Sequence, residues 1–229
     1  MSLWQIIKVI PFLPFAWFDA IRLKGKDENK IYQCFLKHSN RVLKVLGYTL
    51  KVEGKENIPE TGAILFVSNH QGTLDPALVV ASCPYPMAFI SKKKNEKLPI
   101  FGRIAVCLGV IHFDSDTREG NVYMLREAAR RLKQGKRLLI FPEGTRSRHD
   151  QMNPFKAGAL QPAFLAKATI VPITLNNAYC IDDKKDKNRN LSITYGTPLT
   201  YEMYKGKDKQ EVSDYIYQEI EKNILYTNK

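Results

Sequence analysis

Residues 63–80 have the sequence AILFVSNHQGTLDPALVV. The first five residues form an apolar run of strand length, bounded by Gly62 and by the polar residues that follow. Such a run predicts a buried strand that ends in a loop. Asp75 stands before Pro76 and a second apolar series, which predicts a helix with Asp75 at its N-cap and Pro76 as its first residue. The stretch therefore predicts a strand, a loop that carries His70, and a helix.

His70 and Asp75 lie five residues apart in this unit. In a continuous helix their side chains would point about 140° apart, given ~3.6 residues per turn, whereas a loop that contains Gly72 can fold His70 back towards Asp75. A carboxylate beside a histidine fixes the ring tautomer and stabilises the imidazolium that forms when the ring accepts a proton. The pair is therefore a candidate acid/base site. The simpler alternative is an Asp75 that only caps the helix and a loop histidine bonded to backbone.

A second segment, residues 138–147 with the sequence LLIFPEGTRS, repeats the pattern of a buried strand that runs into a polar loop. Three ordered blocks, His70-x4-Asp75, residues 141–147 and Val171-Pro172-Ile173, resemble the 1-acylglycerol-3-phosphate acyltransferase family of glycerolipid acyltransferases. The resemblance extends from about Val52 to Leu175. It implies transfer of an acyl chain from an acyl thioester to the free hydroxyl of 1-acylglycerol 3-phosphate, which gives phosphatidic acid in phospholipid synthesis.

The resemblance also implies roles for the residues of these blocks. His70 would act as general base on the acceptor hydroxyl, which attacks the thioester carbonyl directly, while Asp75 holds the imidazole. The guanidinium of Arg146 suits a phosphate because its planar fork binds two oxygens at once. Glu143 would orient Arg146 or the acceptor's glycerol hydroxyl, unless the two form only a surface ion pair. The residues expected at the substrate phosphate in this block are Glu143, Gly144, Thr145 and Arg146.

One position departs from the family pattern. A block of glycine and apolar residues in the family leads to an arginine that contacts the glycerol phosphate, but this chain has Ser115 there. Arg118 is the nearest replacement in sequence, or else an ordinary partner of Glu119 at a helix start. Lys92 and Lys93 lie in a lysine-bearing stretch that the family shares, and they are further phosphate candidates. For either lysine, the alternative is a solvated surface position.

The composition bounds the fold and the partners. With 229 residues, 44% of them hydrophobic, the chain can bury a sizeable core. We expect an N-terminal helical hairpin over residues 1–47 and one α/β domain over residues 48–229. The formal charge of +12 predicts an anionic partner, which is nucleic acid, a membrane surface or a phosphorylated substrate. No basic motif with interleaved aromatic residues and no recognition-helix pattern is present, so we expect no nucleic-acid partner.

The cysteines and histidines give no sign of a metal centre. The four cysteines are scattered and form no CxxC pair, which favours a reducing compartment over a zinc site or a disulfide framework. The chain has four histidines and no second one near His70, so we expect no metal at that site. We also expect no bound cofactor, because the family's acyl thioester, on coenzyme A or on an acyl carrier protein, is a co-substrate.

The N-terminal segment, residues 3–18, is apolar and aromatic but is interrupted by Gln5, Lys8, Pro11 and Pro14. A spanning helix needs about 20 apolar residues, so this segment is too short and too interrupted to cross a bilayer. It also lacks the basic start and the cleavage site of a signal peptide. We expect it to lie in the membrane interface, joined by a charged break at residues 24–30 to a second helix that ends near Gly47. The alternative is a helix packed on the body of the protein.

The remaining segments predict strands that alternate with helices. Strands are expected at residues 48–53, 87–90, 104–113, 170–175 and 191–195, and helices at residues 121–135, 160–167 and 212–224. This alternation predicts an α/β fold, a mostly parallel sheet flanked by helices, in which ligands gather beyond the carboxyl ends of the strands. The loops at residues 70–75 and 143–147 should therefore open on one edge of the sheet. Backbone N–H groups of the first loop are candidates for an oxyanion hole.

These features and the resemblance together predict an enzyme bound to the membrane, peripheral or monotopic on the cytoplasmic face. Its partners would be a lysophospholipid substrate, a membrane surface with anionic lipid and, as one of two candidate acyl donors, an acyl carrier protein. Two alternatives stay open. One is an acyltransferase that uses glycerol 3-phosphate or another lysolipid, and the other is a non-catalytic basic protein on the membrane surface.

Overall fold

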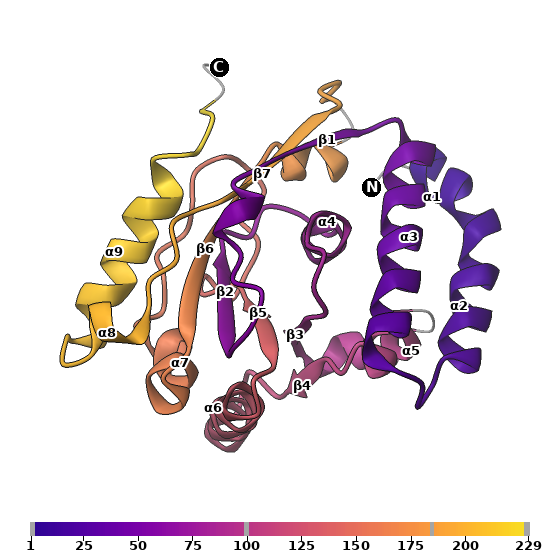
Figure 1. Cartoon of the computed structure of the whole chain (residues 1–229). Helices are drawn as coiled ribbons and strands as arrows, with labels where there is room; N and C mark the ends of the chain where they lie inside the picture. Colours follow the sequence, from indigo (N-terminus) through magenta and orange to yellow (C-terminus); the bar gives the residue numbers. More distant parts are fainter. Residues whose placement is uncertain (1–2, 99–100, 184–185, 227–229) are drawn as a thin grey trace.

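The computed structural model describes residues 3–98, 101–183 and 186–226. Within these residues, one sheet of seven strands has the order β1-β7-β6-β2-β5-β3-β4 (Figure 1). The strands are β1 (Thr49–Glu53), β2 (Ile64–Ser68), β3 (Ala88–Lys92), β4 (Ile111–Phe113), β5 (Arg137–Ile140), β6 (Thr169–Asn176) and β7 (Asn190–Tyr195).

The sheet is mostly parallel, as the sequence predicts. Neighbours are parallel from β6 through β2, β5 and β3 to β4. Strand β7 pairs antiparallel with β6, and β1 pairs parallel with β7 at the edge. The central strand β2 is buried along its whole length, which is typical of a parallel sheet covered on both faces. Because β2 and β5 are parallel neighbours, the loops that follow them leave the sheet at the same edge.

Helices cover both faces of the sheet. One face packs against α4 (Asp75–Ser82) and α3 (Glu28–Leu46), and Phe66 points into that core. The other face packs against α6 (Arg118–Lys133), α7 (Gln161–Ala166) and α9 (Lys209–Glu221), and Leu65 and Val67 point into that second core. The alternation of Leu65, Phe66 and Val67 between two apolar layers explains why β2 has no polar face. A short helix, α8 (Tyr201–Tyr204), leads into α9.

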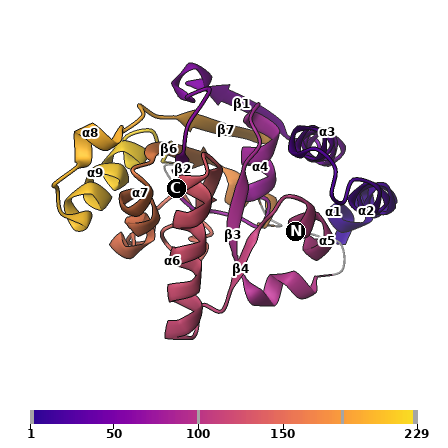
Figure 2. The same cartoon turned by 60° about the horizontal axis from the view of Figure 1, so that its bottom comes forward.

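The N-terminal residues form the expected helical hairpin beside the sheet (Figure 2). Helix α1 (Leu3–Val9), the 3₁₀ turn η1 (Ile10–Phe12) and α2 (Leu13–Arg22) follow one another, with a proline in the first two positions of η1 and of α2, where its missing N–H costs little. Helix α3 begins after the N-cap Asp27 and ends at Gly47, which has a φ of 75°. No helix within the described residues has both the length and the hydropathy to cross a bilayer.

The strand expected over residues 104–113 is wrong in its first half. Helix α5 (Phe101–Cys107) occupies that part, and β4 takes up the last three residues. Gly109, with a φ of 66°, makes the break between them, because few other residues adopt that conformation. A short apolar run has no period that distinguishes a strand from a helix. The remaining 3₁₀ segments are η2 (Lys55–Asn57), η3 (Lys93–Lys97), η4 (Ala157–Leu160) and η5 (Ala178–Ile181).

Candidate active site

The two polar loops meet at the carboxyl edge of the sheet. Val67 of β2 pairs with Ile140 of β5, so the loop with His70 and the loop with Glu143 leave the sheet as neighbours. A backbone hydrogen bond of 2.7 Å from the N–H of Ser147 to the carbonyl oxygen of His70 joins the loops directly. The expectation that both loops open on one edge is confirmed.

His70 and Asp75 form the expected pair. The distance from His70 Nδ1 to Asp75 Oδ2 is 2.7 Å, and Asp75 is fully buried. The carboxylate also accepts hydrogen bonds from the N–H groups of Gln71, at 2.6 Å, and of Gly72, at 2.9 Å. The N-cap position is held by Leu74 and has no side-chain bond, so the expected cap by Asp75 is wrong. The carboxylate turns back into the preceding loop instead, where it fixes the histidine.

The surroundings of Asp75 determine which ring nitrogen of His70 can act as a base. Burial raises the pKa of Asp75, and the bonds from His70, Gly72 and Gln71 oppose that rise. The N–H groups of Gln71 and Gly72 already donate to this carboxylate, which favours an ionised Asp75 as the acceptor and His70 Nδ1 as the nitrogen that carries the proton. The lone pair of His70 is then on Nε2, which makes no hydrogen bond to any described residue. The ring is 20% exposed, so a substrate can approach it.

Packing fixes the plane of the imidazole. The ring of Phe141, at the end of β5, stacks on His70 with 4.2 Å between ring centroids and 20° between planes. Gly72 lets the loop pass close to η5, because a Cβ at this position would lie 2.7 Å from the carbonyl oxygen of Ala178. The side chain of Gln71, which is buried, accepts a hydrogen bond of 2.9 Å from the N–H of Ala178. The loop therefore holds one conformation around His70.

Glu143 supports the backbone of His70. Its Oε1 accepts the N–H of His70 at 2.6 Å, and its Oε2 accepts the backbone and side-chain N–H groups of Asn153 at 2.9 and 2.8 Å. Burial raises the pKa of Glu143, and these bonds oppose the rise. Both oxygens are engaged, so the structure does not place Glu143 as the partner that orients Arg146. Asn153 was missed because nothing in its local sequence marks it.

Arg146 lies against the far end of the His70 loop. Its guanidinium donates to the hydroxyl of Thr73, and its Nη1 is 4.0 Å from Asp182 Oδ2. Asp182 also accepts the N–H of Thr73 at 2.7 Å, so one carboxylate holds both the loop and the arginine. The Arg146 side chain is more than one-third exposed and can reach a ligand. Arg146 is therefore a predicted phosphate cation that bonds directly to the His70 loop.

A further cation beside this loop was missed by the sequence analysis. Gly144 has a φ of 69°, and the position that a Cβ would take there lies 3.1 Å from Lys156 Nζ. The N–H of Lys156 bonds to the carbonyl oxygen of Pro142 at 3.1 Å, which holds the lysine over the Glu143 loop. Lys156 is exposed. Nothing in its local sequence marks Lys156 as a neighbour of Gly144, because that contact depends on the path of the loop.

The other predicted cations lie on the same edge at greater distance. Lys92 ends β3, the strand beside β5, and Lys93 begins η3. Arg118 begins α6 after β4, which is three strand spacings from β2, about 14 Å at the usual ~4.8 Å per strand. The Arg118 side chain lines a surface hollow formed by α6 residues, among them Tyr123 and Arg126.

Carboxylates occupy the backbone N–H groups of residues 70–73. The N–H of His70 bonds to Glu143, those of Gln71 and Gly72 bond to Asp75, and that of Thr73 bonds to Asp182. The expected oxyanion hole in this part of the loop is therefore wrong, because a substrate oxygen would have to displace a carboxylate. Within the described residues, this edge brings together no group of three metal ligands.

Comparisons with known proteins identify the family of the chain. A family model described as Acyltransferase matches residues 49–176, which include both loops. A Helicobacter pylori protein named 1-acyl-sn-glycerol-3-phosphate acyltransferase is 35% identical over 172 residues, which are 75% of this chain and 68% of the relative. A Mycoplasma pneumoniae protein named probable 1-acyl-sn-glycerol-3-phosphate acyltransferase is 27% identical over 193 residues, 78% of this chain and 72% of the relative.

A solved structure shows the same fold. The crystal structure of the 1-acyl-sn-glycerophosphate acyltransferase PlsC from Thermotoga maritima superposes with a TM-score of 0.81 at 23% identity, over 96% of this chain and 91% of that one. The family model covers more than half of the chain, and its range includes the His70–Asp75 pair and the Glu143 loop. The chain belongs to the acyltransferase family, among relatives named 1-acyl-sn-glycerol-3-phosphate acyltransferases.

Proposed function

We propose that this protein is a 1-acylglycerol-3-phosphate O-acyltransferase. It transfers an acyl chain from an acyl thioester to the free hydroxyl of 1-acylglycerol 3-phosphate, and the product is phosphatidic acid. The observation that carries the proposal is the His70–Asp75 pair, 2.7 Å apart, with Nε2 of the ring left for the substrate. The names of the relatives supply the acceptor. The basic side chains beside the loop fit its phosphate.

The reaction needs no nucleophile from the protein, because the acceptor brings its own hydroxyl. His70 Nε2 removes the hydroxyl proton while the oxygen attacks the thioester carbonyl carbon. The tetrahedral intermediate collapses, the C–S bond breaks, and the thiolate leaves with the proton from the imidazolium. Asp75 stabilises the imidazolium between these steps, as the carboxylate does in hydrolytic triads. Positioned general-base catalysis of this kind typically contributes about 10²–10⁴-fold.

We propose that Arg146 and Lys156 bind the acceptor phosphate directly. Arg146 bonds to Thr73 of the His70 loop, and Lys156 lies over Gly144 of the Glu143 loop, so each of the two loops that meet at this edge carries a cation against it. A phosphate that carries two charges in a partly dehydrated site needs more than one cation. Gly144 and Thr145 bring backbone close to the same place. Lys92, Lys93 and Arg118 stay proposed as outer cations on this edge.

Replacing Arg146 by alanine is expected to raise the acceptor's KM about tenfold or more, since a hydrogen bond to a charged group is worth about 1.5–3 kcal/mol. The KM for the thioester should stay near the wild-type value. Lys156→Ala should raise the same KM, and the double variant should show less than the sum of the two effects if both cations bind one phosphate. Arg118→Ala, farther along the edge, should have a smaller effect. An unchanged acceptor KM in Arg146→Ala would remove this residue from the phosphate site.

The acyl donor is proposed as acyl-CoA or acyl-[acyl carrier protein], used as a co-substrate. Each of these donors carries anionic groups elsewhere in the molecule, in addition to the thioester. The protein's net charge of +12 is compatible with either donor. The test of the overall proposal is product formation. Purified protein, given 1-acylglycerol 3-phosphate and each thioester in turn, should release one thiol for each phosphatidic acid formed. Thiol release without phosphatidic acid would indicate hydrolysis and contradict the proposal.

We also propose that the protein sits on the cytoplasmic face of the membrane as a peripheral or monotopic protein. Helices α1 and α2 expose large apolar side chains, of which Phe15 is 60% and Phe18 64% exposed. Ile7, Ile10 and Ile21 belong to the same exposed set. The opposite side of α2 is buried through Ala16 and Ala20, so the outward apolar face is not needed for packing. Lys24 and Lys26, exposed just after α2, favour anionic lipid.

The double variant Phe15→Ser, Phe18→Ser tests this placement. Burial of each phenylalanine in lipid is worth about 1.5–3 kcal/mol, so the variant should bind vesicles of anionic lipid at least tenfold more weakly than wild type. The matched control is Met203→Ser, Leu225→Ser, which removes two comparably exposed apolar side chains from the C-terminal part of the chain. The measurement is co-sedimentation at moderate salt. The placement would be contradicted if both double variants lost binding to the same extent, or if neither lost any.

A further inference from the structure

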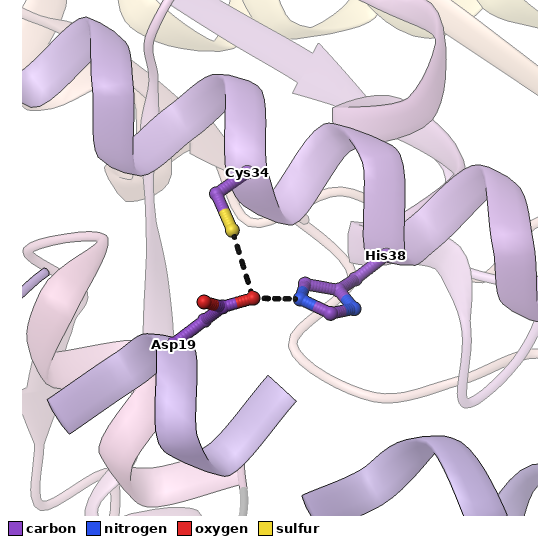
Figure 3. Close-up of side chains that lie close together, drawn as sticks. All are labelled: Asp19, Cys34 and His38. Carbon is purple, nitrogen blue, oxygen red and sulfur yellow. Dashed lines mark hydrogen bonds and ion pairs between the residues drawn. The ribbon is translucent and has the colours of Figure 1, made fainter. Parts of the chain in front are cut away.

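Asp19, Cys34 and His38 converge between α2 and α3 (Figure 3). Cys34 and His38 stand four residues apart on α3, so both side chains project from the same face of the helix. Asp19 projects from α2 across the gap between the helices. Its Oδ2 atom lies 2.9 Å from His38 Nε2 and 3.3 Å from Cys34 Sγ. Nothing in the acyl-transfer mechanism uses these residues.

The three side chains offer one oxygen, one sulfur and one nitrogen ligand, all within 4.8 Å of one another. Zinc bound by these atoms at about 2.0–2.3 Å in a tetrahedron would hold them about 3.4–3.7 Å apart. In the structure the Asp19 oxygen lies 3.3 Å from Cys34 Sγ and 2.9 Å from His38 Nε2, so binding would lengthen these two distances by less than about 1 Å. Arg22 pairs with the other carboxylate oxygen, Oδ1, at 2.9 Å and therefore does not cover Oδ2.

The surroundings of the cluster suit a bound ion. The side chains of Asp19 and His38 are 25% and 15% exposed, so the position is shielded but open to solvent. Ala20, Ile31 and Phe35 are buried together beside it, and they fix the spacing of the two helices. Burial and the neighbouring Asp19 raise the pKa of the Cys34 thiol to about 11. Without an ion the thiol stays protonated and donates a hydrogen bond to Asp19.

We propose that Asp19, Cys34 and His38 form a binding site for one divalent transition-metal ion of the zinc type. The ion is held by the Asp19 carboxylate, the Cys34 thiolate and His38 Nε2, and water takes the fourth position. When the sulfur–metal bond forms, the thiol proton leaves to solvent, and the two anionic ligands balance the charge of the ion. Sulfur and imidazole nitrogen select zinc or cobalt over magnesium and calcium, which prefer oxygen ligands.

The ion would join α2 to α3. Helix α2 carries the exposed Phe15 and Phe18 on its outer side, so a metal bond on its inner side would hold that apolar face in place against the rest of the molecule. The site does not depend on the acyl-transfer reaction. Its test can therefore succeed or fail whatever the protein does at His70.

The experiment is a titration of the purified, full-length protein with Co²⁺ and with Zn²⁺. We expect one ion per chain, a Kd of about 1 µM or lower for Zn²⁺, and the strong visible bands and thiolate charge-transfer band of four-coordinate Co²⁺. Binding of Zn²⁺ should release about one proton per ion, measured calorimetrically in buffers of different ionisation enthalpy, because Cys34 gives up its proton. Added Zn²⁺ should raise the Tm of wild type.

Two variants and a matched control decide the outcome. Cys34→Ser and His38→Gln should each lose the Co²⁺ spectrum and the rise in Tm with Zn²⁺. Both residues are half-buried, and a Tm measured without metal checks that each variant folds. Cys107→Ser should keep both, although Cys107 is also half-buried and its thiol donates to the backbone of Ala20 at 2.9 Å. The proposal is overturned if wild type binds no stoichiometric ion, if both variants bind as wild type does, or if the spectrum disappears in Cys107→Ser instead.

Discussion

His70→Ala is expected to lower kcat for acyl transfer by about 10²–10⁴-fold, because the variant has no base to accept the hydroxyl proton. The ring makes one side-chain hydrogen bond, to Asp75, and its other nitrogen has no partner among the described residues. The backbone bonds of the loop to Glu143 and Ser147 do not involve the ring. The variant should therefore fold and bind vesicles as wild type does. The measurement is steady-state formation of phosphatidic acid.

A matched control is His149→Ala, which removes an exposed histidine just beyond the Glu143 loop and should keep wild-type activity. Asp75→Asn should also be severe, because a neutral amide stabilises the imidazolium less well than a carboxylate. If His70→Ala keeps activity within a factor of about ten of wild type, the assignment of the base is wrong, since general-base catalysis is usually worth more.

Glu143→Ala is expected to lower both stability and kcat. The change leaves the N–H of His70 and two N–H groups of Asn153, all part-buried, without their acceptors. A fully buried donor left unpaired costs about 1–3 kcal/mol, and these donors should cost less than that each. The free energy of unfolding should fall accordingly, with part of the loss visible as a lower Tm. Because His70 then loses its fixed position, kcat should fall while the acceptor's KM changes little.

Glu143→Gln is the partner experiment. One amide oxygen remains to accept a bond, so stability should recover in part and kcat should lie between Glu143→Ala and wild type. A role in binding the substrate phosphate would give another pattern: the acceptor's KM would rise in both variants while the Tm stayed at the wild-type value. That result would contradict the supporting role that the bonds to His70 and Asn153 indicate.

The sequence predicts the pairing of His70 with Asp75 because the two residues are close in sequence. An apolar run, a polar loop with glycine and an Asp-Pro helix start lie within 18 consecutive residues, and their order decides where His70 and Asp75 meet. The parallel sheet follows from the alternation of buried strands and helices, and it brings the Glu143 loop to the same edge. The direction of the Asp75 carboxylate depends on backbone N–H groups of the folded loop. The prediction that Asp75 caps the helix was therefore wrong.

Features that depend on the path of the chain beyond a local pattern could not be predicted in the same way. Asn153 and Lys156 reach Glu143 and Gly144 through the path of a loop that has no periodic pattern. The apolar residues 104–113 divide into a helix and a short strand, and only tertiary packing settles that choice. In the same way, the spacing of Cys34 and His38 is readable in the sequence, but their shared partner Asp19 lies on another helix.

The most direct test of the proposed function is a comparison of two acceptors that differ in the phosphate alone. Wild-type protein should acylate 1-acylglycerol 3-phosphate with a kcat/KM at least 100-fold above that for monoacylglycerol, since losing two charge-assisted contacts of about 1.5 kcal/mol or more each removes that much binding. Arg146→Ala should narrow the ratio. Equal use of both acceptors by wild type would contradict the phosphate site and the choice of substrate.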